Sequence, residues 1–194
     1  MRLIVVGASW GGLHAVGRLL AQLPAGQLGD AAIVVAQHRS ADSEEGVLAE
    51  LLQTAGSLRV TDADDKQPID PGRAYLAPPD YHLLVEPGRF ALSVDERVQF
   101  ARPSIDVLFE SAADAYGDRV IGIVLTGANA DGAVGLARIK AHGGKTVVQD
   151  PASAERAAMP LAAIAELEPD AVLPLEEIAP YVLELCRVPE EARA

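Results

Sequence analysis

Three side chains whose types suit ester or amide hydrolysis are spread along the sequence: Ser9, His38 and Asp131. A serine hydroxyl is a weak nucleophile until a histidine takes its proton, and a carboxylate can hold that histidine in the productive orientation. Each residue also has an ordinary structural use. Ser9 is equally typical of a structural or anion-binding turn, His38 of an exposed strand end, and Asp131 of a helix cap. The chemistry depends on whether the fold brings them together.

Ser9 lies in the glycine-rich stretch GASWGG, residues 7–12, directly after an apolar run. Glycines let the backbone turn sharply here and let a substrate approach closely. The first backbone N–H groups of a helix have no partner within that helix, so a helix starting at this turn can hold an oxyanion. Trp10 and Gly11 are the predicted donors, with the N–H of Trp10 nearest to the serine.

Two known motifs compete for the same turn. GASWG matches the G-x-S-x-G elbow of α/β-hydrolases, but in those enzymes the elbow follows several strands and the acid precedes the histidine. Here the chain order is serine, histidine, aspartate, which argues against that fold. The dinucleotide fingerprint G-x-G-x-x-G would need a glycine at position 9. Phosphate binding is therefore the weaker use of the turn.

The elements that must position these residues follow an alternating pattern. Apolar runs of strand length alternate with segments of helical periodicity, which is typical of a parallel sheet covered by helices on both faces. Strands are predicted at 2–7, 31–38, 119–127, 145–150 and 171–174. Helices are predicted at 11–22, 44–54, 104–116, 131–143, 154–166 and 175–187, with Pro160 interrupting the fifth and Pro180 weakening the sixth. The fold class is α/β, doubly wound and mostly parallel.

The middle of the chain has a different pattern. From about residue 74 to about residue 95, short apolar runs are broken by Pro78-Pro79-Asp80 and by Pro87-Gly88, both of which are turn signals. A small antiparallel hairpin region is predicted there. The rest of the sheet is expected to be parallel.

Parallel strands all end at one edge of a sheet, and doubly wound folds bind their ligands at that edge. Ser9 follows the first predicted strand, His38 ends the second, and Asp131 lies in the loop after the strand at 119–127. We therefore expect the three side chains to meet at the carboxyl edge, as the parts of a nucleophilic hydrolase.

Composition excludes several classes of function. No stretch resembles a linker, and 194 residues can build one core, so a single domain over residues 1–194 is expected. The net charge of −12 argues against nucleic acid or an anionic membrane surface as a partner. No apolar stretch approaches the length of a membrane span, and the N-terminus carries no export signal, so a cytoplasmic location without membrane insertion is expected.

Cysteine and histidine spacing gives no indication of a metal or a cofactor, and we expect neither. The one cysteine, Cys186, has no disulfide partner and no neighbouring metal ligand, and is predicted to be a small apolar residue on the last helix. The sequence contains no H-E-x-x-H, no C-x-x-C and no EF-hand spacing.

Seven segments, taken in order, make the chain resemble the catalytic domain of CheB, the chemotaxis protein-glutamate methylesterase, over nearly its whole length. They are VVGASWGG, VVAQH, YLAPPDYHLLVEPG, RPSIDVLFESAA, IGIVLTGANADGAVGL, GGKTVVQDPASAERAAMPLAAI and VLPLEEIA. The resemblance implies a serine esterase that releases methanol from glutamyl methyl esters of chemoreceptors and can also deamidate certain receptor glutamines. It implies that Ser9, His38 and Asp131 are the catalytic triad.

The chain departs from the family pattern at two positions beside the expected site. Trp10 stands where a small residue or threonine is usual, and Ala128 stands where methionine is frequent. We expect both to border the substrate and to affect receptor specificity. The best-known members carry a phosphorylatable receiver domain ahead of the catalytic domain, and none is expected in this chain. It is either a stand-alone member controlled by a separate regulatory partner or a fragment.

The acidic net charge gives no long-range attraction to a glutamate-rich receptor helix. We hypothesise that Arg39, next to His38, and Arg102, which opens RPSIDVLF, form a local positive rim that orients the receptor. Two other functions remain open at this stage. One is a non-catalytic anion-binding or signalling module, and the other is an esterase for small molecules on the same fold.

Overall fold

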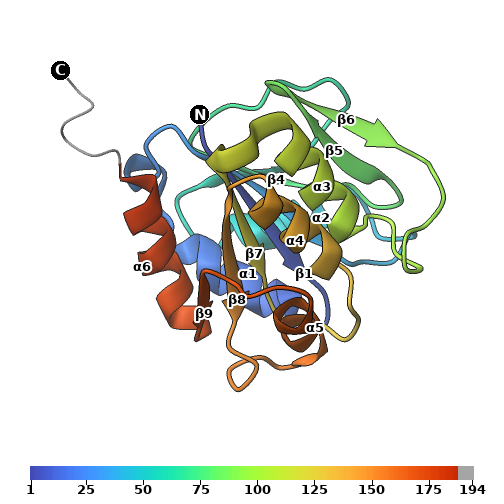
Figure 1. Ribbon diagram of the computed structural model, residues 1–194. Coiled ribbons are helices and arrows are strands. Elements are labelled where there is room, and N and C mark those ends of the chain that lie inside the picture. Colours follow the sequence, from blue (N-terminus) through green and yellow to red (C-terminus); the bar gives the residue numbers. More distant parts are fainter. Residues whose placement is uncertain (188–194) are drawn as a thin grey trace.

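The computed structural model describes residues 1–187 of the chain. A seven-stranded sheet with the order β3-β4-β2-β1-β7-β8-β9 lies at its centre, and all of its strand pairs are parallel (Figure 1). The strands of this sheet are β1 (Leu3–Ala8), β2 (Ala32–Gln37), β3 (Arg59–Asp62), β4 (Arg73–Leu76), β7 (Val120–Val124), β8 (Lys145–Gln149) and β9 (Ala171–Leu173). A separate antiparallel hairpin is formed by β5 (His82–Glu86) and β6 (Arg89–Ser93). The predicted α/β, mostly parallel fold with a small antiparallel region is confirmed.

Helices cover both faces of the sheet (Figure 1). The helices are α1 (Gly12–Ala21), α2 (Val47–Gln53), α3 (Ile105–Tyr116), α4 (Ala133–Ala141), α5 (Ala158–Glu166) and α6 (Leu175–Cys186), with short 3-10 turns at Ala25–Gln27 and Gly117–Arg119. Along β1, alternate residues enter opposite cores: Leu3 and Val5 pack with α3 and α4, whereas Ile4 and Val6 pack with α1 and α6. A continuous apolar run therefore serves two layers at once.

Two parts of the sheet differ from the sequence-based expectation. The strand β3 was not predicted, because at this edge of the sheet only Val60 of its four residues is buried and the run has too few apolar residues to be recognised. Residues Arg73–Leu76 begin the segment predicted as antiparallel, yet they form β4, a parallel strand of the main sheet. The hairpin itself is confined to the later part of that segment.

The two helical prolines have different outcomes. The fifth helix begins at Ala158, so Pro160 lies in its first turn, where its missing N–H removes no intrahelical bond. Pro180 lies inside α6, and the helix nevertheless continues to Cys186. Burial of Ile178, Val182 and Cys186 against the sheet explains why the helix tolerates it. Cys186 is 4% exposed, as expected for a small apolar residue.

The order of the strands explains the position of the site. From β1 the chain goes to β2 on one side, and it later returns to the other side of β1 as β7. A crevice forms at the carboxyl end of such a switch point, because the connections on its two sides diverge. The turn after β1 and the loop after β7 lie at this switch point, and the end of β2 lies beside them.

Candidate active site

The structure brings Ser9, His38 and Asp131 together at the carboxyl edge of the sheet. Ser9 is the first residue after β1, His38 is the first after β2, and Asp131 lies in the loop between β7 and α4. The Oγ of Ser9 lies 3.2 Å from Nδ1 of His38, and Nε2 of the same ring lies 2.7 Å from Oδ2 of Asp131. The three side chains form one continuous chain of hydrogen bonds.

The two nitrogens of the His38 ring have different partners. A carboxylate can only accept, so Nε2 carries the proton donated to Asp131, and Nδ1 of the neutral ring is left as an acceptor for the Ser9 hydroxyl. In the serine-protease template Nε2 faces the serine and Nδ1 the aspartate, so the ring is used the other way round here. The side-chain amide nitrogen of Asn129 lies 3.4 Å from the same Nδ1 and is a second donor to it.

Asp131 is buried, with 1% of its surface exposed, and its carboxylate accepts from several donors. Oδ2 accepts from the Ile105 N–H at 2.7 Å, and Oδ1 accepts from the Asp106 N–H and from the Ser104 hydroxyl, both at 2.9 Å. Burial alone would raise the pKa of Asp131, but the hydrogen bonds from His38 and the two amides outweigh it and hold the pKa below its ordinary value. Asp131 is therefore an anion at neutral pH.

The turn after β1 is fixed by backbone contacts on both sides of Ser9. Its N–H donates to the Thr126 carbonyl at 3.0 Å, and its carbonyl accepts from the Gly12 N–H at 2.8 Å. The side-chain amide of Gln37 donates to the same carbonyl at 2.8 Å. The turn that carries Ser9 is thus tied to the segment after β7 and to the end of β2, which His38 follows.

Backbone donors of this turn are available to a ligand. Gly11 has a φ of +77°, in the left-handed region that favours glycine, and this conformation lets the chain turn directly into α1. Within residues 1–187 the N–H groups of Trp10 and Gly11 make no backbone hydrogen bond. Free N–H groups next to a nucleophile are suited to stabilising an oxyanion.

The indole of Trp10 is held in place although it is 58% exposed. Its Nε1–H donates to Oε1 of Glu155 at 3.0 Å, and the guanidinium carbon of Arg156 lies 5.4 Å from the ring centroid, within range of a cation–π contact. Glu155 and Arg156 come from the segment between β8 and α5. Trp10 is a fixed wall beside Ser9.

Ala128 is exposed and lies in the loop after β7. It follows Gly127, where an added Cβ would lie 3.0 Å from the Cβ of Ser9 and 1.8 Å from the Sδ of Met159. The backbone after β7 therefore approaches the serine closely, and only glycine fits at position 127. No acceptor is found for the Ala128 N–H within the described residues, so it too is available to a ligand.

The predicted positive rim is not formed by free charges. Arg39 has a side chain only 8% exposed, donates to Oδ1 of Asp62 at 3.0 Å, and also donates to the Ala77 carbonyl. Arg102 donates to Oδ1 of Asp80 at 2.7 Å, and this hydrogen bond is the largest cause of the lowered pKa of Asp80. Both guanidinium groups are paired with carboxylates, so little positive charge remains to attract a receptor.

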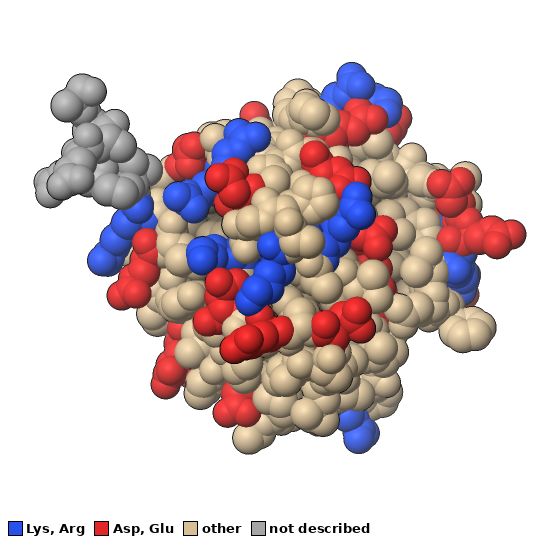
Figure 2. All heavy atoms as spheres, viewed as in Figure 1, with Lys and Arg blue, Asp and Glu red and all other residues tan. Residues whose placement is uncertain are grey.

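The same pairing of opposite charges is seen over the surface. On the face drawn in Figure 2, acidic side chains stand beside the basic ones. With a net charge of −12, this distribution offers no basic surface on that face for an anionic partner.

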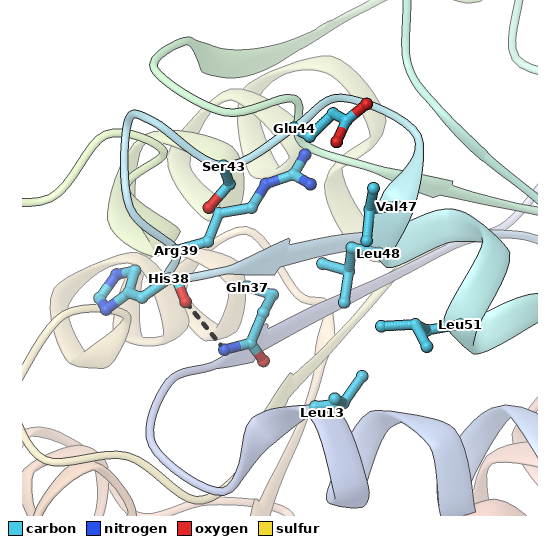
Figure 3. A pocket seen from close by; sticks show the side chains of 9 residues that line it. All are labelled: Leu13, Gln37, His38, Arg39, Ser43, Glu44, Val47, Leu48 and Leu51. Carbon is cyan, nitrogen blue, oxygen red and sulfur yellow. Dashed lines mark hydrogen bonds between the residues drawn. The ribbon is translucent and has the colours of Figure 1, made fainter.

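Two clefts border His38, and Ser9 lines neither. One, of about 380 Å³, lies between the end of β2, α1 and α2, and its wall is mainly apolar (Figure 3). It is lined by Leu13, Gln37, His38, Arg39, Ser43, Glu44, Val47, Leu48 and Leu51. The His38 ring points away from the leucines in this view. The other, of about 430 Å³, is more polar and includes Gln99, Phe100, Arg102 and Asn129.

Sequence reasoning missed four residues of this site: Gln37, Asn129, Ser104 and Asp106. Gln37 and Asn129 are polar residues next to predicted strand ends, and that position was the available signal. Ser104 had the signal of an N-cap before an apolar helix, and its hydroxyl accepts from the Val107 N–H at 3.4 Å while it donates to Asp131. Asp106 gave no signal beyond being an acidic residue in the first turn of a predicted helix.

Residues 1–187 show neither a group of metal ligands nor a helix suited to crossing a membrane. Within residues 1–187, no three His, Cys, Asp or Glu side chains are grouped as they would be around a metal ion. None of the helices over the same residues combines the length and the apolar character that a bilayer crossing requires.

Known proteins of one family match the chain over almost all of its length. The family model CheB methylesterase matches residues 4–182. A putative protein-glutamate methylesterase/protein-glutamine glutaminase from Leptospira interrogans is 48% identical over 183 residues, which cover 94% of this chain and 93% of that protein. The protein-glutamate methylesterase FrzG of Myxococcus xanthus is 39% identical over 94% of this chain, which spans only 54% of that longer protein.

A solved structure agrees with the sequence relatives. The catalytic domain of Thermotoga maritima CheB methylesterase superposes with a TM-score of 0.86 at 31% identity, covering 95% of this chain and 98% of that one. The predicted resemblance is confirmed, and with it the fold. On these matches, the chain belongs to the CheB methylesterase family.

Proposed function

We propose that this chain is a protein-glutamate methylesterase that hydrolyses glutamyl methyl esters of chemoreceptors with Ser9, His38 and Asp131 as its catalytic triad. The observation that carries the proposal is the chain of hydrogen bonds from Asp131 through His38 to Ser9, at 2.7 and 3.2 Å. Family membership and the relatives' names support the substrate class. Deamidation of receptor glutamines is proposed for the same site, because an amide is attacked by the same chemistry.

The first step forms an acyl-enzyme. Nδ1 of His38 takes the hydroxyl proton as Oγ of Ser9 attacks the ester carbonyl, and the carbonyl oxygen becomes an oxyanion. The N–H of Trp10 is the proposed donor to this oxyanion, together with those of Gly11 and Ala128. The protonated His38 then gives its proton to the departing methoxy oxygen, so methanol leaves and an acyl ester of Ser9 remains.

The second step restores the enzyme. His38 removes a proton from water, the resulting hydroxide attacks the acyl carbonyl, and collapse of this intermediate returns the proton to Oγ of Ser9. The products are a glutamate carboxylate and free enzyme. With a glutamine substrate the leaving group of the first step is ammonia instead of methanol.

Asp131 acts in both steps through His38. Its anionic carboxylate fixes the tautomer with the proton on Nε2, which leaves Nδ1 free to act as the base. It also stabilises the imidazolium that forms in each step, because its lowered pKa keeps the negative charge in place. Asp131 itself need not take up a proton.

Methanol release from methylated receptor membranes tests the proposal. Wild-type protein is expected to release methanol, and Ser9→Ala to reduce the rate by at least about a thousandfold. Ser57→Ala is the matched control, because Ser57 is an exposed serine that lines neither of the clefts beside His38. Release by Ser9→Ala at the wild-type rate would show that Ser9 is not the nucleophile.

Chemical labelling separates the competing functions. A fluorophosphonate should label wild-type protein and the Ser57→Ala control, and should fail with Ser9→Ala. An unlabelled wild-type protein would favour a non-catalytic anion-binding module. Labelling together with hydrolysis of a small activated ester, but without methanol from receptors, would assign the site to a small-molecule esterase. Control by a separate regulatory partner is tested by adding cell extract fractions to the methanol assay.

A further inference from the structure

Two helices that lie side by side, α3 and α4, begin close to each other (Figure 1). The first N–H groups of each helix need partners from outside that helix. Asp131, from the loop before α4, accepts from the N–H groups of Ile105 and Asp106 in α3. It therefore caps a helix, as one of the two sequence interpretations allowed, but the helix is α3 and not the one that follows it.

Asp106, from the first turn of α3, caps α4 in return. Its Oδ1 accepts from the Gly132 N–H at 2.9 Å and from the Gly135 N–H at 2.7 Å. The N-cap residue of α4 is Gly132, with a φ of +99°, and glycine has no side chain with which to cap. The start of α4 therefore depends on the carboxylate of Asp106.

These reciprocal hydrogen bonds between Asp106 and Asp131 fix the backbone next to Asp131. The residue after it, Gly132, is bonded through its N–H to Asp106, and the carboxylate of Asp131 is bonded to the backbone of Asp106. Asp106 is 5% exposed. It has no contact with Ser9 or His38 among its hydrogen bonds, so any effect on chemistry must pass through the residues that it does bond.

Asp106 is also linked to a segment that faces the polar cleft beside His38. The side-chain amide of Gln99 donates to Oδ2 of Asp106 at 3.1 Å. Gln99 and Phe100 have backbone φ angles of 48° and 66°, which residues other than glycine rarely adopt. Phe100 is also 96% exposed. Both residues line the cleft that includes His38 and Asn129.

We propose that Asp106 is a positioning residue for the hydrolysis, which holds the turn carrying Asp131 by capping α4 and ties that turn through Gln99 to the cleft wall at Phe100. The inference rests on the proposed function of the triad. Removing the carboxylate leaves the Gly132 and Gly135 N–H groups without an acceptor. The turn can then shift, and because reacting groups must be aligned closely, a displacement of about 1 Å costs about a hundredfold in rate.

The proposal predicts a specific kinetic pattern. Asp106→Ala is expected to lower kcat about a hundredfold and to leave KM within about twofold, because Asp106 aligns the base without binding the ester. Asp106→Asn keeps an oxygen that can accept from both glycines and is expected to retain kcat within about fivefold of wild type. Glu110→Ala, an exposed acid on the same helix, is the matched control and should change nothing.

Three measurements on the 194-residue chain test this pattern: kcat and KM for methanol release from receptor membranes, the rate of fluorophosphonate labelling of Ser9, and circular dichroism. Labelling is expected to slow in Asp106→Ala as kcat does, since it needs an aligned triad but no receptor. Equal kcat in Asp106→Ala and Glu110→Ala would overturn the proposal, as would an Asp106→Asn as impaired as Asp106→Ala.

A failure of Asp106→Ala to fold and a failure of the proposed function give different results. If Asp106→Ala does not fold, Gln99→Ala decides, because it leaves both helix caps in place and removes only the tie to the cleft wall. A reduced kcat together with slowed fluorophosphonate labelling of Ser9, at unchanged stability, would support the proposal. An unchanged kcat, or a reduced kcat with unchanged labelling, would overturn it. If wild-type protein itself neither releases methanol nor is labelled at Ser9, the proposed function has failed and not this inference alone.

Discussion

The carboxylate of Asp131 lies 2.7 Å from Nε2 of His38, on the opposite side of the ring from the nitrogen that faces Ser9. The distance and the burial of Asp131 make this a strong, charge-assisted contact whenever the ring is protonated. Because Nε2 of His38 is bonded to Asp131, Nδ1 is left to accept from Ser9. The orientation of the His38 ring is therefore set by one carboxylate.

Replacement of Asp131 by asparagine is expected to lower kcat about ten-thousandfold with little change in KM. An amide NH₂ placed toward Nε2 would favour the tautomer with the proton on Nδ1, and Nδ1 could then no longer accept the proton of Ser9. The measurement is kcat for methanol release. Asp114→Asn is the control, because Asp114 is an exposed acid on α3. A loss of less than about tenfold would contradict the role given to Asp131.

Replacement of His38 by alanine is expected to abolish turnover and leave the fold intact. The ring lies at a strand end with 14% of its side chain exposed, and it faces the site and not either core. Turnover is measured by methanol release, and the fold by circular dichroism and thermal melting. A collapse of folding stability in this variant would favour the alternative of a structural histidine.

The buried ion pair between Arg39 and Asp62 gives a prediction about stability. Their side chains are 8% and 7% exposed, so Arg39→Met leaves the Asp62 charge without its partner and should lower the free energy of unfolding by about 3 kcal/mol. The control is Arg138→Met, which breaks an exposed pair with Asp114 and should cost about 1 kcal/mol or less. Urea denaturation measures both.

If both variants lower the free energy of unfolding equally, the buried pair of Arg39 and Asp62 contributes no more to stability than an exposed ion pair. The outcome also bears on the positive-rim hypothesis. If Arg39 is a structural ion pair, the KM for receptor membranes should change little with ionic strength, because exposed attraction between charges is screened by salt. A KM that rises steeply with salt would instead support the hypothesis that Arg39 and Arg102 form a positive rim that attracts the receptor.

The ionisation of Asp106 predicts how stability depends on pH. Burial, followed by the negative charge of Asp131, raises the pKa of Asp106 to about 6, although the amides of Gly132 and Gly135 act in the opposite direction. The native state therefore holds this proton more tightly than the unfolded chain, whose carboxyl has an ordinary pKa near 3.8. Stability from this group is present below about pH 4 and is lost as pH rises to about 6.

Comparison with Asp106→Asn isolates this effect, because the amide does not titrate. The free energy of unfolding of wild type minus that of the variant should decrease by up to about 3 kcal/mol between about pH 4 and pH 7. Asp131, whose lowered pKa acts in the opposite sense, is present in both proteins and largely cancels. Urea denaturation across this range measures the difference. A difference that stays constant, or increases with pH, would contradict the raised pKa.

Periodicity alone was enough to predict the layers of the fold and the edge at which the candidate site lies. The apolar runs around Val5, Val34 and Ile123 are long enough for buried parallel strands, and such strands must end at a common edge. Ser9 and His38 directly follow two of these runs, so their proximity required no knowledge of contacts. The strand β4 was placed in the wrong sheet because its run of three apolar residues, 74–76, does not indicate its partner strand.

What the sequence by itself determined was the alternation of strands and helices and the position of Ser9, His38 and Asp131 just beyond strand ends, since both depend on neighbours along the chain. Only the tertiary structure decided which nitrogen of His38 meets Asp131, that Arg39 and Arg102 are already paired, and that Asp106 and Asp131 cap each other's helices. The physical reason is that these contacts join residues 22 to 93 positions apart. Their geometry is set by strand order and helix packing, which no local pattern encodes.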